Sequence, residues 1–182
     1  LARRLRHLRA FGVDRQHGER TVPGVYDVTA LGFNYRMSEI NAAMGIEQLK
    51  KVSRFLAQRR QNFESISEKI SLLDGIRVLP QPCDSRITSS HYCLGVILES
   101  ESSRPELMAG LTRVGVGSSV YYPAPVPDMS YYKAKYEQSP EDFTGAQFIS
   151  DRILALPVGP HLGEQDAARV AEGFATVWQE TR

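Results

Sequence analysis

The sequence lacks several features that would assign it to a narrow class of proteins. It holds only two cysteines, Cys83 and Cys93, in 182 residues. Two are too few for a disulfide framework, and their spacing matches neither a metal-binding nor a redox motif. We therefore expect two reduced thiols, as in a cytoplasmic protein. No run of about 18 apolar residues occurs, so the sequence predicts no membrane-spanning helix and no membrane partner.

An excess of charge of one sign is also lacking. The 22 basic and 21 acidic residues leave a formal net charge of +1. This balance excludes a strongly basic nucleic-acid-binding protein and an acidic solvating tail. The arginines of the first segment are expected to form a solvated helix surface rather than a nucleic-acid contact, because Asp14 and Glu19 dilute the patch.

The familiar catalytic motifs are missing. The four histidines, among them His17, form no HExxH sequence, and the chain has no P-loop, GxGxxG or GxSxG pattern. We expect no metal site. An amine that forms a Schiff base needs an apolar setting, whereas all the lysines stand in polar stretches: Lys50, Lys51, Lys69, Lys133 and Lys135. We therefore predict no catalytic residue within this chain.

Hydrophobic periodicity gives the expected elements. Helices are predicted over residues 1–11, from Ser38 onward, and over 53–73, 103–114, 145–156 and 163–179, and strands over 76–79, 92–98 and 116–122. The order β-β-α-β-α-α after residue 76 favours a small antiparallel or mixed sheet with helices on one face. A domain boundary is expected near residues 50–55. The expected core stripes are Leu56, Phe63, Ile66, Ile70 and Leu73 on one helix and Ala167, Val170, Phe174 and Val177 on another.

One stretch has the composition of an anion site. Residues 32–39 read GFNYRMSE, so that an amide and a guanidinium directly precede a predicted helix. Asn34 could donate two N–H bonds, Arg36 could bind an anion bidentately, and a helix N-terminus favours negative charge. The residues alone leave a structural alternative equally open, in which Arg36 pairs with Glu39 beside a capping turn.

Two further stretches hold candidate ligand contacts. Tyr121 and Tyr122 end a predicted strand before a proline-rich loop, where they could line a pocket for a ring, although half-buried strand tyrosines are the commoner case. His161 lies in the segment LPVGPHL between two predicted helices. A single histidine in such a place is usually structural.

The residues quoted above carry a resemblance to a known family. The run 32–39, continued by NAAMG at 41–45 and QLKK at 48–51, closely resembles a hallmark segment of the DegT/DnrJ/EryC1/StrS sugar aminotransferases. These are pyridoxal-phosphate (PLP) enzymes of fold type I. The segments 120–123 and 156–162 have counterparts in the same order. The resemblance covers nearly the whole chain and corresponds to the C-terminal half of the family's proteins.

This resemblance implies an α/β fold of PLP fold type I, present in part. Residues 1–52 would be the C-terminal end of the large PLP-binding domain with its linking helix. Residues 53–182 would be a small α+β domain with a three- to four-stranded sheet and flanking helices. The family moves an amino group, commonly from glutamate, to a keto-sugar nucleotide. Its Schiff-base lysine is expected before Leu1, so these residues alone are expected to be inactive.

The resemblance also assigns roles to single residues. Asn34 matches the residue that reaches the cofactor phosphate of the partner subunit in a homodimer with composite active sites, and Arg36 lies near the same entrance. Tyr121 and Tyr122 match the loop that borders the sugar pocket, and His161 is a further candidate on the substrate side. Two alternatives stay open: the sugar dehydratase branch of the family, and a non-catalytic α+β binding or dimerisation module.

Overall fold

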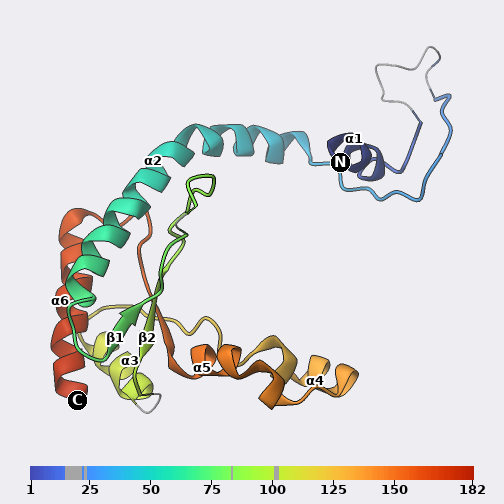
Figure 1. The fold of residues 1–182 in the computed structure, drawn as a ribbon. Helices are drawn as coiled ribbons and strands as arrows, with labels where there is room; N and C mark the ends of the chain where they lie inside the picture. Colours follow the sequence, from blue (N-terminus) through green and yellow to red (C-terminus); the bar gives the residue numbers. More distant parts are fainter. Residues whose placement is uncertain (15–21, 23, 83, 101–102) are drawn as a thin grey trace. The chain divides into compact units, whose positions relative to one another are not determined.

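The computed structural model describes residues 1–14, 22, 24–82, 84–100 and 103–182 (Figure 1). Cys83, His17 and Glu19 lie outside the described residues. The elements follow in the order α1 (Ala2–Leu8), α2 (Glu39–Ile70), β1 (Ile76–Val78), β2 (Leu94–Leu98), α3 (Ser103–Arg113), η2 (Val126–Asp128), α4 (Ser130–Tyr136), η3 (Pro140–Phe143), α5 (Thr144–Arg152), β3 (Ile153–Leu156) and α6 (Glu164–Thr181).

The chain divides into two compact units, Leu1–Lys51 and Val52–Arg182. The first unit has no buried side chain among its described residues. It is held by backbone contacts, in which the turn after α1 crosses the segment before α2. Gly12 has a φ of +67°, and a Cβ there would collide with the carbonyl oxygen of Ala30. Glycine is therefore required by both the dihedral and the close approach.

The helix α2 is one uninterrupted helix of 32 residues. Ser38 caps it as the sequence predicts, since its Oγ accepts the backbone N–H of Asn41 at 3.2 Å. The prediction of two helices, with the second beginning near Ser53, was wrong. No proline or turn residue stands between the two apolar patterns, and the single Gly45 inside the helix is tolerated.

The second unit is built on a three-stranded antiparallel sheet in the order β1-β2-β3. Ile76 pairs with Leu98 across β1 and β2, and Leu94 pairs with Leu156 across β2 and β3. All five residues of β2 and all four of β3 are buried. The expected strand near 76–79 and the strand within 92–98 are thus confirmed.

Two predicted elements around this sheet were wrong. Residues 153–156 form β3 and do not continue the preceding helix, which ends at Arg152. A four-residue apolar run buried on both faces has no alternation that separates a strand from a buried helix. Residues 116–122 make only an isolated bridge between Ser119 and Ala155. The prediction also missed α4 after the proline-rich loop.

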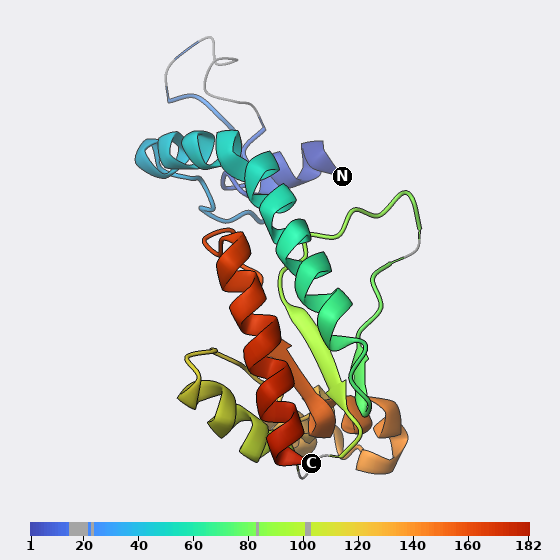
Figure 2. The same cartoon turned by 90° about the vertical axis from the view of Figure 1, so that its left-hand side faces the viewer.

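The core lies between the sheet and two long helices. Figure 2 shows α6 and the later part of α2 in front of the sheet, and α5 behind it. Lys69 on α2 and Glu172 on α6 join the two helices at 3.5 Å. The predicted stripes supply much of this core: Phe63, Ile66, Ile70, Ala167, Val170, Phe174 and Val177 are buried. The mixed fold with a small sheet and flanking helices is therefore confirmed.

The contact between α3 and α6 depends on the absence of a side chain at Gly110. A Cβ at this position would collide with Cγ1 of Val177. We expect Gly110→Ala to lower the free energy of unfolding by about 1–3 kcal/mol, because the packed helices must separate. Urea denaturation measures this change. The control is Gly145→Ala in α5, where nothing lies within 4 Å of the new Cβ. Equal effects of the two substitutions would contradict the packing.

Candidate functional site

The first candidate group lies in the first unit, where backbone bonds fix the segment before α2. The N–H of Phe33 donates to Leu8 O at 2.7 Å, and the N–H of Tyr35 donates to Arg9 O at 2.8 Å. Between them, Asn34 makes a bridge with Ala10. The backbone of residues 33–35 is therefore held at both sides of Asn34, while its side chain stays exposed.

The side chains of Asn34 and Arg36 meet within this unit. Arg36 Nε donates to Asn34 Oδ1 at 3.3 Å, and the guanidinium lies over the Phe11 ring at 4.9 Å from its centre. The oxygen of the amide is thus occupied, which leaves the Asn34 Nδ2 donors without a partner among the described residues. No ion pair joins Arg36 to Glu39 in the described part of the chain. The pairing of these two residues, which the sequence left open as an alternative, is therefore not present.

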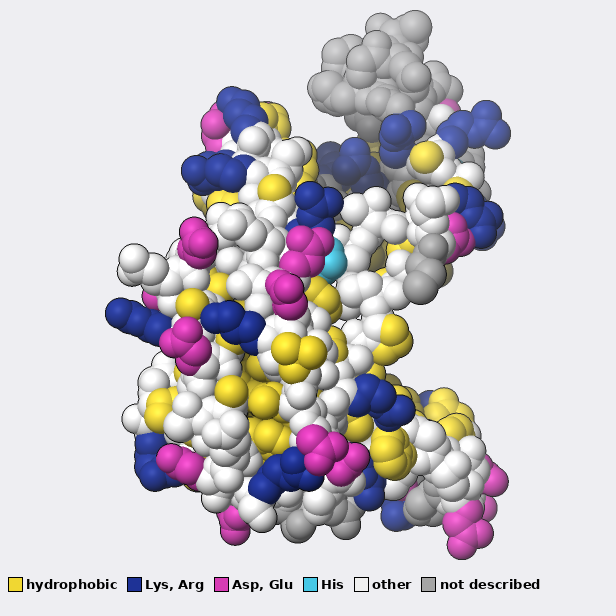
Figure 3. Space-filling view, turned by 60° about the vertical axis from the view of Figure 1, so that its left-hand side comes forward, with side chains coloured by type: hydrophobic (Ala, Val, Ile, Leu, Met, Phe, Trp, Pro, Cys, Tyr) yellow, Lys and Arg dark blue, Asp and Glu magenta, His cyan; other side chains and the backbone are white. Residues whose placement is uncertain are grey.

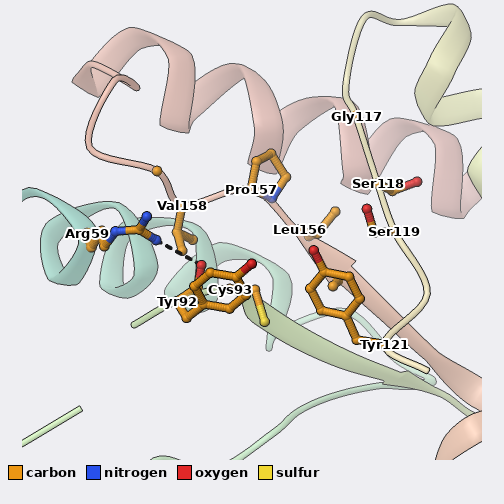
Figure 4. Close-up of a pocket in the computed structure, with 12 residues that line it drawn as sticks. Arg59, Tyr92, Cys93, Gly117, Ser118, Ser119, Tyr121, Leu156, Pro157 and Val158 are labelled. Carbon is orange, nitrogen blue, oxygen red and sulfur yellow. Dashed lines mark hydrogen bonds between the residues drawn. The ribbon is translucent and has the colours of Figure 1, made fainter. Parts of the chain in front are cut away.

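The second candidate group surrounds a pocket of about 360 Å³ in the second unit (Figure 4). Arg59 of α2 lines it, together with Tyr92 and Cys93 at the start of β2. The remaining walls come from the segments 117–121 and 155–159. The pocket therefore lies at the end of the sheet where β2 begins and β3 ends.

Three tyrosines form a stack at this pocket. The Tyr92 and Tyr121 rings are 6.4 Å apart at 19°, and those of Tyr121 and Tyr122 are 5.4 Å apart at 26°. The hydrogen bond to Tyr121, together with the charge of that phenol, raises the pKa of Tyr92. Tyr121 lines the pocket, whereas Tyr122 is 67% exposed and only flanks it.

Arg59 is the only charged residue among the described residues that line the pocket. Its Nη1 donates to the carbonyl oxygen of Tyr92 at 2.9 Å, and the guanidinium lies 5.8 Å from the centre of the Tyr92 ring. Burial raises the pKa of the neighbouring Cys93 thiol, and the charge of Arg59 partly offsets this rise. Arg59 thus shapes one wall of the pocket and sets its electrostatics.

The loop that carries His161 is held by a buried amide. Asn62 on α2 is only 1% exposed, and its Nδ2 donates to Gly159 O at 3.0 Å and to Leu162 O at 3.2 Å. Its Oδ1 accepts from Gln58 at 3.0 Å. His161 itself is exposed, does not line the pocket, and rests its ring on Gly159, where a Cβ would collide with it.

The predicted site residues are thus distributed over both units. Asn34 and Arg36 lie together in the first unit, and Tyr121, Tyr122 and His161 lie in or beside the pocket region of the second. Sequence reasoning missed Arg59 and Asn62 as site residues. The only signal for Asn62 was a polar side chain on the apolar stripe one position before Phe63. The helix segment with Arg59 and Arg60 has a counterpart in the family that the sequence resembles, but that resemblance gave Arg59 no role.

All five lysines are exposed, as the sequence predicts. Within the described ranges, no three side chains of His, Cys, Asp or Glu come together as metal ligands would. No helix in the described part of the chain combines the length and apolar composition that crossing a membrane requires. Basic and acidic side chains are interspersed on the face drawn in Figure 3.

The buried amide of Asn62 gives a test of the loop anchor. We expect Asn62→Ala to lower the free energy of unfolding by about 1–3 kcal/mol, because the two hydrogen bonds from the buried amide to the loop are lost. Urea denaturation measures the loss, and faster amide exchange in residues 159–162 locates it. Gln61→Ala, at the exposed neighbouring position, is the control and should change little. A loss no greater than that of the control would show that the anchor contributes nothing.

The tyrosine stack gives a test of the pocket's electrostatics. In Tyr121→Phe we expect the pKa of Tyr92 to fall toward the ordinary value of about 10, because the hydrogen-bonding phenol is gone. Titration of the tyrosine Cζ resonances by NMR measures the pKa. Tyr122→Phe should produce a smaller fall, since Tyr122 acts only through its charge.

Because the pKa of Tyr92 is raised in the folded state, the free energy of unfolding depends on pH. A raised pKa favours the neutral phenol in the folded state, so the stabilisation is present below pH about 10 and is lost as the pH rises through the pKa of the folded state.

The titration of Tyr121→Phe can contradict the assigned hydrogen bond. It would do so if the pKa of Tyr92 were the same as in the wild type.

Comparison with known proteins relates both candidate groups to one family. The model of the DegT/DnrJ/EryC1/StrS aminotransferase family matches residues 1–175. A dTDP-4-amino-4,6-dideoxy-D-glucose transaminase from Escherichia coli is 25% identical over 145 residues, which cover 80% of this chain and 39% of that protein.

Solved structures agree with this match. The aminotransferase TlmJ from Streptoalloteichus hindustanus is 27% identical with a TM-score of 0.78, over 98% of this chain and 45% of that one. Spr1654 from Streptococcus pneumoniae, solved in a PMP form, shares the fold with a TM-score of 0.83 at 20% identity, over 97% of this chain and 44% of that one. The chain spans less than half the length of each of these relatives. It belongs to the DegT/DnrJ/EryC1/StrS aminotransferase family.

Proposed function

We propose that this chain is part of a PLP-dependent sugar aminotransferase, which moves an amino group from an amino acid, with glutamate as the expected donor, to a keto-sugar nucleotide. The observation that carries the proposal is the family match over residues 1–175. The name of the Escherichia coli relative, a transaminase of a dideoxy-sugar nucleotide, supports this reading over the dehydratase branch.

The residues of the first unit fit the phosphate group of PLP. Spr1654, whose fold the chain shares, has been solved in PLP and PMP forms. Arg36 occupies the Asn34 oxygen, so the amide presents only its N–H donors to an anion. Asn34 would donate to the phosphate, and Arg36 would hold the amide in that orientation and add a positive charge. When bound, PLP supplies the electron sink of the reaction, and the protein binds and orients it.

A homodimer with composite sites follows from this assignment. In the first unit many large apolar side chains are exposed, among them Leu1, Leu5, Leu31, Phe33, Tyr35, Met37, Ile40, Met44 and Leu49. Extended apolar surface of this kind marks a contact with other protein. We propose that it is covered in the assembled enzyme, where Asn34 reaches the cofactor of the partner subunit.

The second unit would form the substrate side of the site. Tyr121 lines the pocket, and the ring of Tyr122 stacks on the ring of Tyr121 beside it. Two phenols therefore lie on the same side of the pocket. Such rings can orient a sugar by stacking and by hydrogen bonds. His161, fixed by its contact with Gly159, would act at the margin of this side rather than inside the pocket.

Subunit mixing tests the proposal in the assembled enzyme. We expect Asn34→Ala to weaken retention of PLP about 10-fold or more, because one charge-assisted hydrogen bond of about 1.5–3 kcal/mol is lost. Mixing this variant with subunits that lack the Schiff-base lysine should restore part of the transaminase activity, since some sites in the heterodimer then carry neither defect.

The matched control is Asn41→Ala, which removes an exposed amide in the first turn of α2. It should neither release PLP nor lower the transaminase activity. An assembled Asn34→Ala enzyme that keeps its PLP as tightly as the control, or a mixture that recovers no activity, would contradict the shared site.

A further inference from the structure

An arginine without a carboxylate partner lines the pocket of the second unit. Nη1 of Arg59 donates to the carbonyl oxygen of Tyr92 at 2.9 Å. Among the described residues, no acceptor takes the N–H groups of Nη2 and Nε. No aspartate or glutamate of the described part of the chain lines the pocket. The half-buried guanidinium therefore brings an uncompensated positive charge to a cavity whose other walls are neutral.

Neutral donors line the other end of the pocket. The backbone of Ser119 is bonded to Ala155 at 2.8 and 3.1 Å, which fixes the position of the residue. Its hydroxyl and that of Ser118 have no partner among the described residues. Figure 4 shows Arg59 at one end, Ser119 and Tyr121 at the other, and Tyr92 between them, whereas the Ser118 hydroxyl points away from this group. The polar groups of the pocket can therefore reach a ligand from both ends.

The wall between these polar groups is apolar. Leu156, Pro157 and Val158 line it, and Leu156 and Val158 are only 1% exposed. The volume of about 360 Å³ lies within the range of small-molecule sites. A cation, a short apolar wall and a group of hydroxyls match a small organic acid with a few methylene groups.

We propose that this pocket binds the carboxylate of a small organic acid through Arg59, with the hydroxyl group of Ser119 holding its other polar end. If the proposed function holds, on which this identification rests, the acid is the amino donor or the keto acid formed from it. A carboxylate matches the single charge and planar fork of one guanidinium.

The test is titration of the full chain with glutamate, followed by ¹H–¹⁵N NMR. We expect saturable shifts of the Tyr92, Cys93, Ser118 and Ser119 amide signals. Arg59→Gln keeps a donor for the Tyr92 carbonyl but removes the charge, and should weaken binding about 10-fold or more. The control is Arg60→Gln on the same helix, where the exposed arginine pairs with Glu64 at 3.8 Å. It should leave the affinity unchanged.

Parallel titrations with inorganic phosphate and with a nucleoside diphosphate separate the possible anions. Tighter binding of either one at this pocket would overturn the carboxylate assignment. So would the absence of saturable shifts at these signals, or equal affinity in Arg59→Gln and the wild type. Ser119→Ala provides a second variant that leaves the Arg59 contact intact and should weaken binding less. Because neither PLP nor turnover is needed, a negative result leaves the proposed function standing.

Discussion

The hydrogen bonds of one buried amide on α2 hold the candidate pocket together. Asn62 binds the carbonyl oxygens of Gly159 and Leu162, which follow it by 97 and 100 residues in the sequence. One turn earlier, Arg59 binds the carbonyl oxygen of Tyr92. The two side chains thus tie the loop after β3 and the start of β2 to a single helix. Because a buried side-chain amide without acceptors is costly, the contacts of Asn62 fix where the loop after β3 lies.

The two units of the chain are stabilised by different means. The second has a continuous core, in which Ile66, Phe174 and Trp178 pack with the sheet. The first has no buried side chain among its described residues and is held by backbone bonds, with Gly12 and Gly32 at the crossing. A segment that exposes so much apolar surface needs other protein to cover it. This surface fits the proposed assembly, in which Asn34 serves the partner subunit.

The sequence predicts those parts of the fold in which the spacing of apolar residues is unambiguous. Apolar residues recur every three or four positions along α6 and along the part of α2 that holds Phe63, Ile66 and Ile70. They are buried as expected. The β3 run, ILAL, is buried on both faces, so its pattern does not separate a strand from a helix. The short α4 has no apolar stripe at all, and its tyrosines are exposed.

The candidate site residues can likewise be recognised from the sequence only in part. The short segment around Asn34 and Arg36 can be recognised because its residue types are local in the sequence and precede a helix cap. The pocket cannot be recognised in this way, since Arg59, Tyr92, Ser119 and Leu156 come from four separate segments. Only the register of the sheet and the anchor at Asn62 bring them together. Likewise, nothing in the sequence shows that Arg36 bonds to Asn34 instead of Glu39.

The most direct measurement is a crystal structure of the assembled enzyme with PLP bound. If the site is shared, Nδ2 of Asn34 in one subunit will lie within about 3 Å of a phosphate oxygen of the cofactor held by the other subunit. An Asn34 side chain that points into solvent, or that packs away from any bound phosphate, would contradict the shared site and with it the proposed assembly.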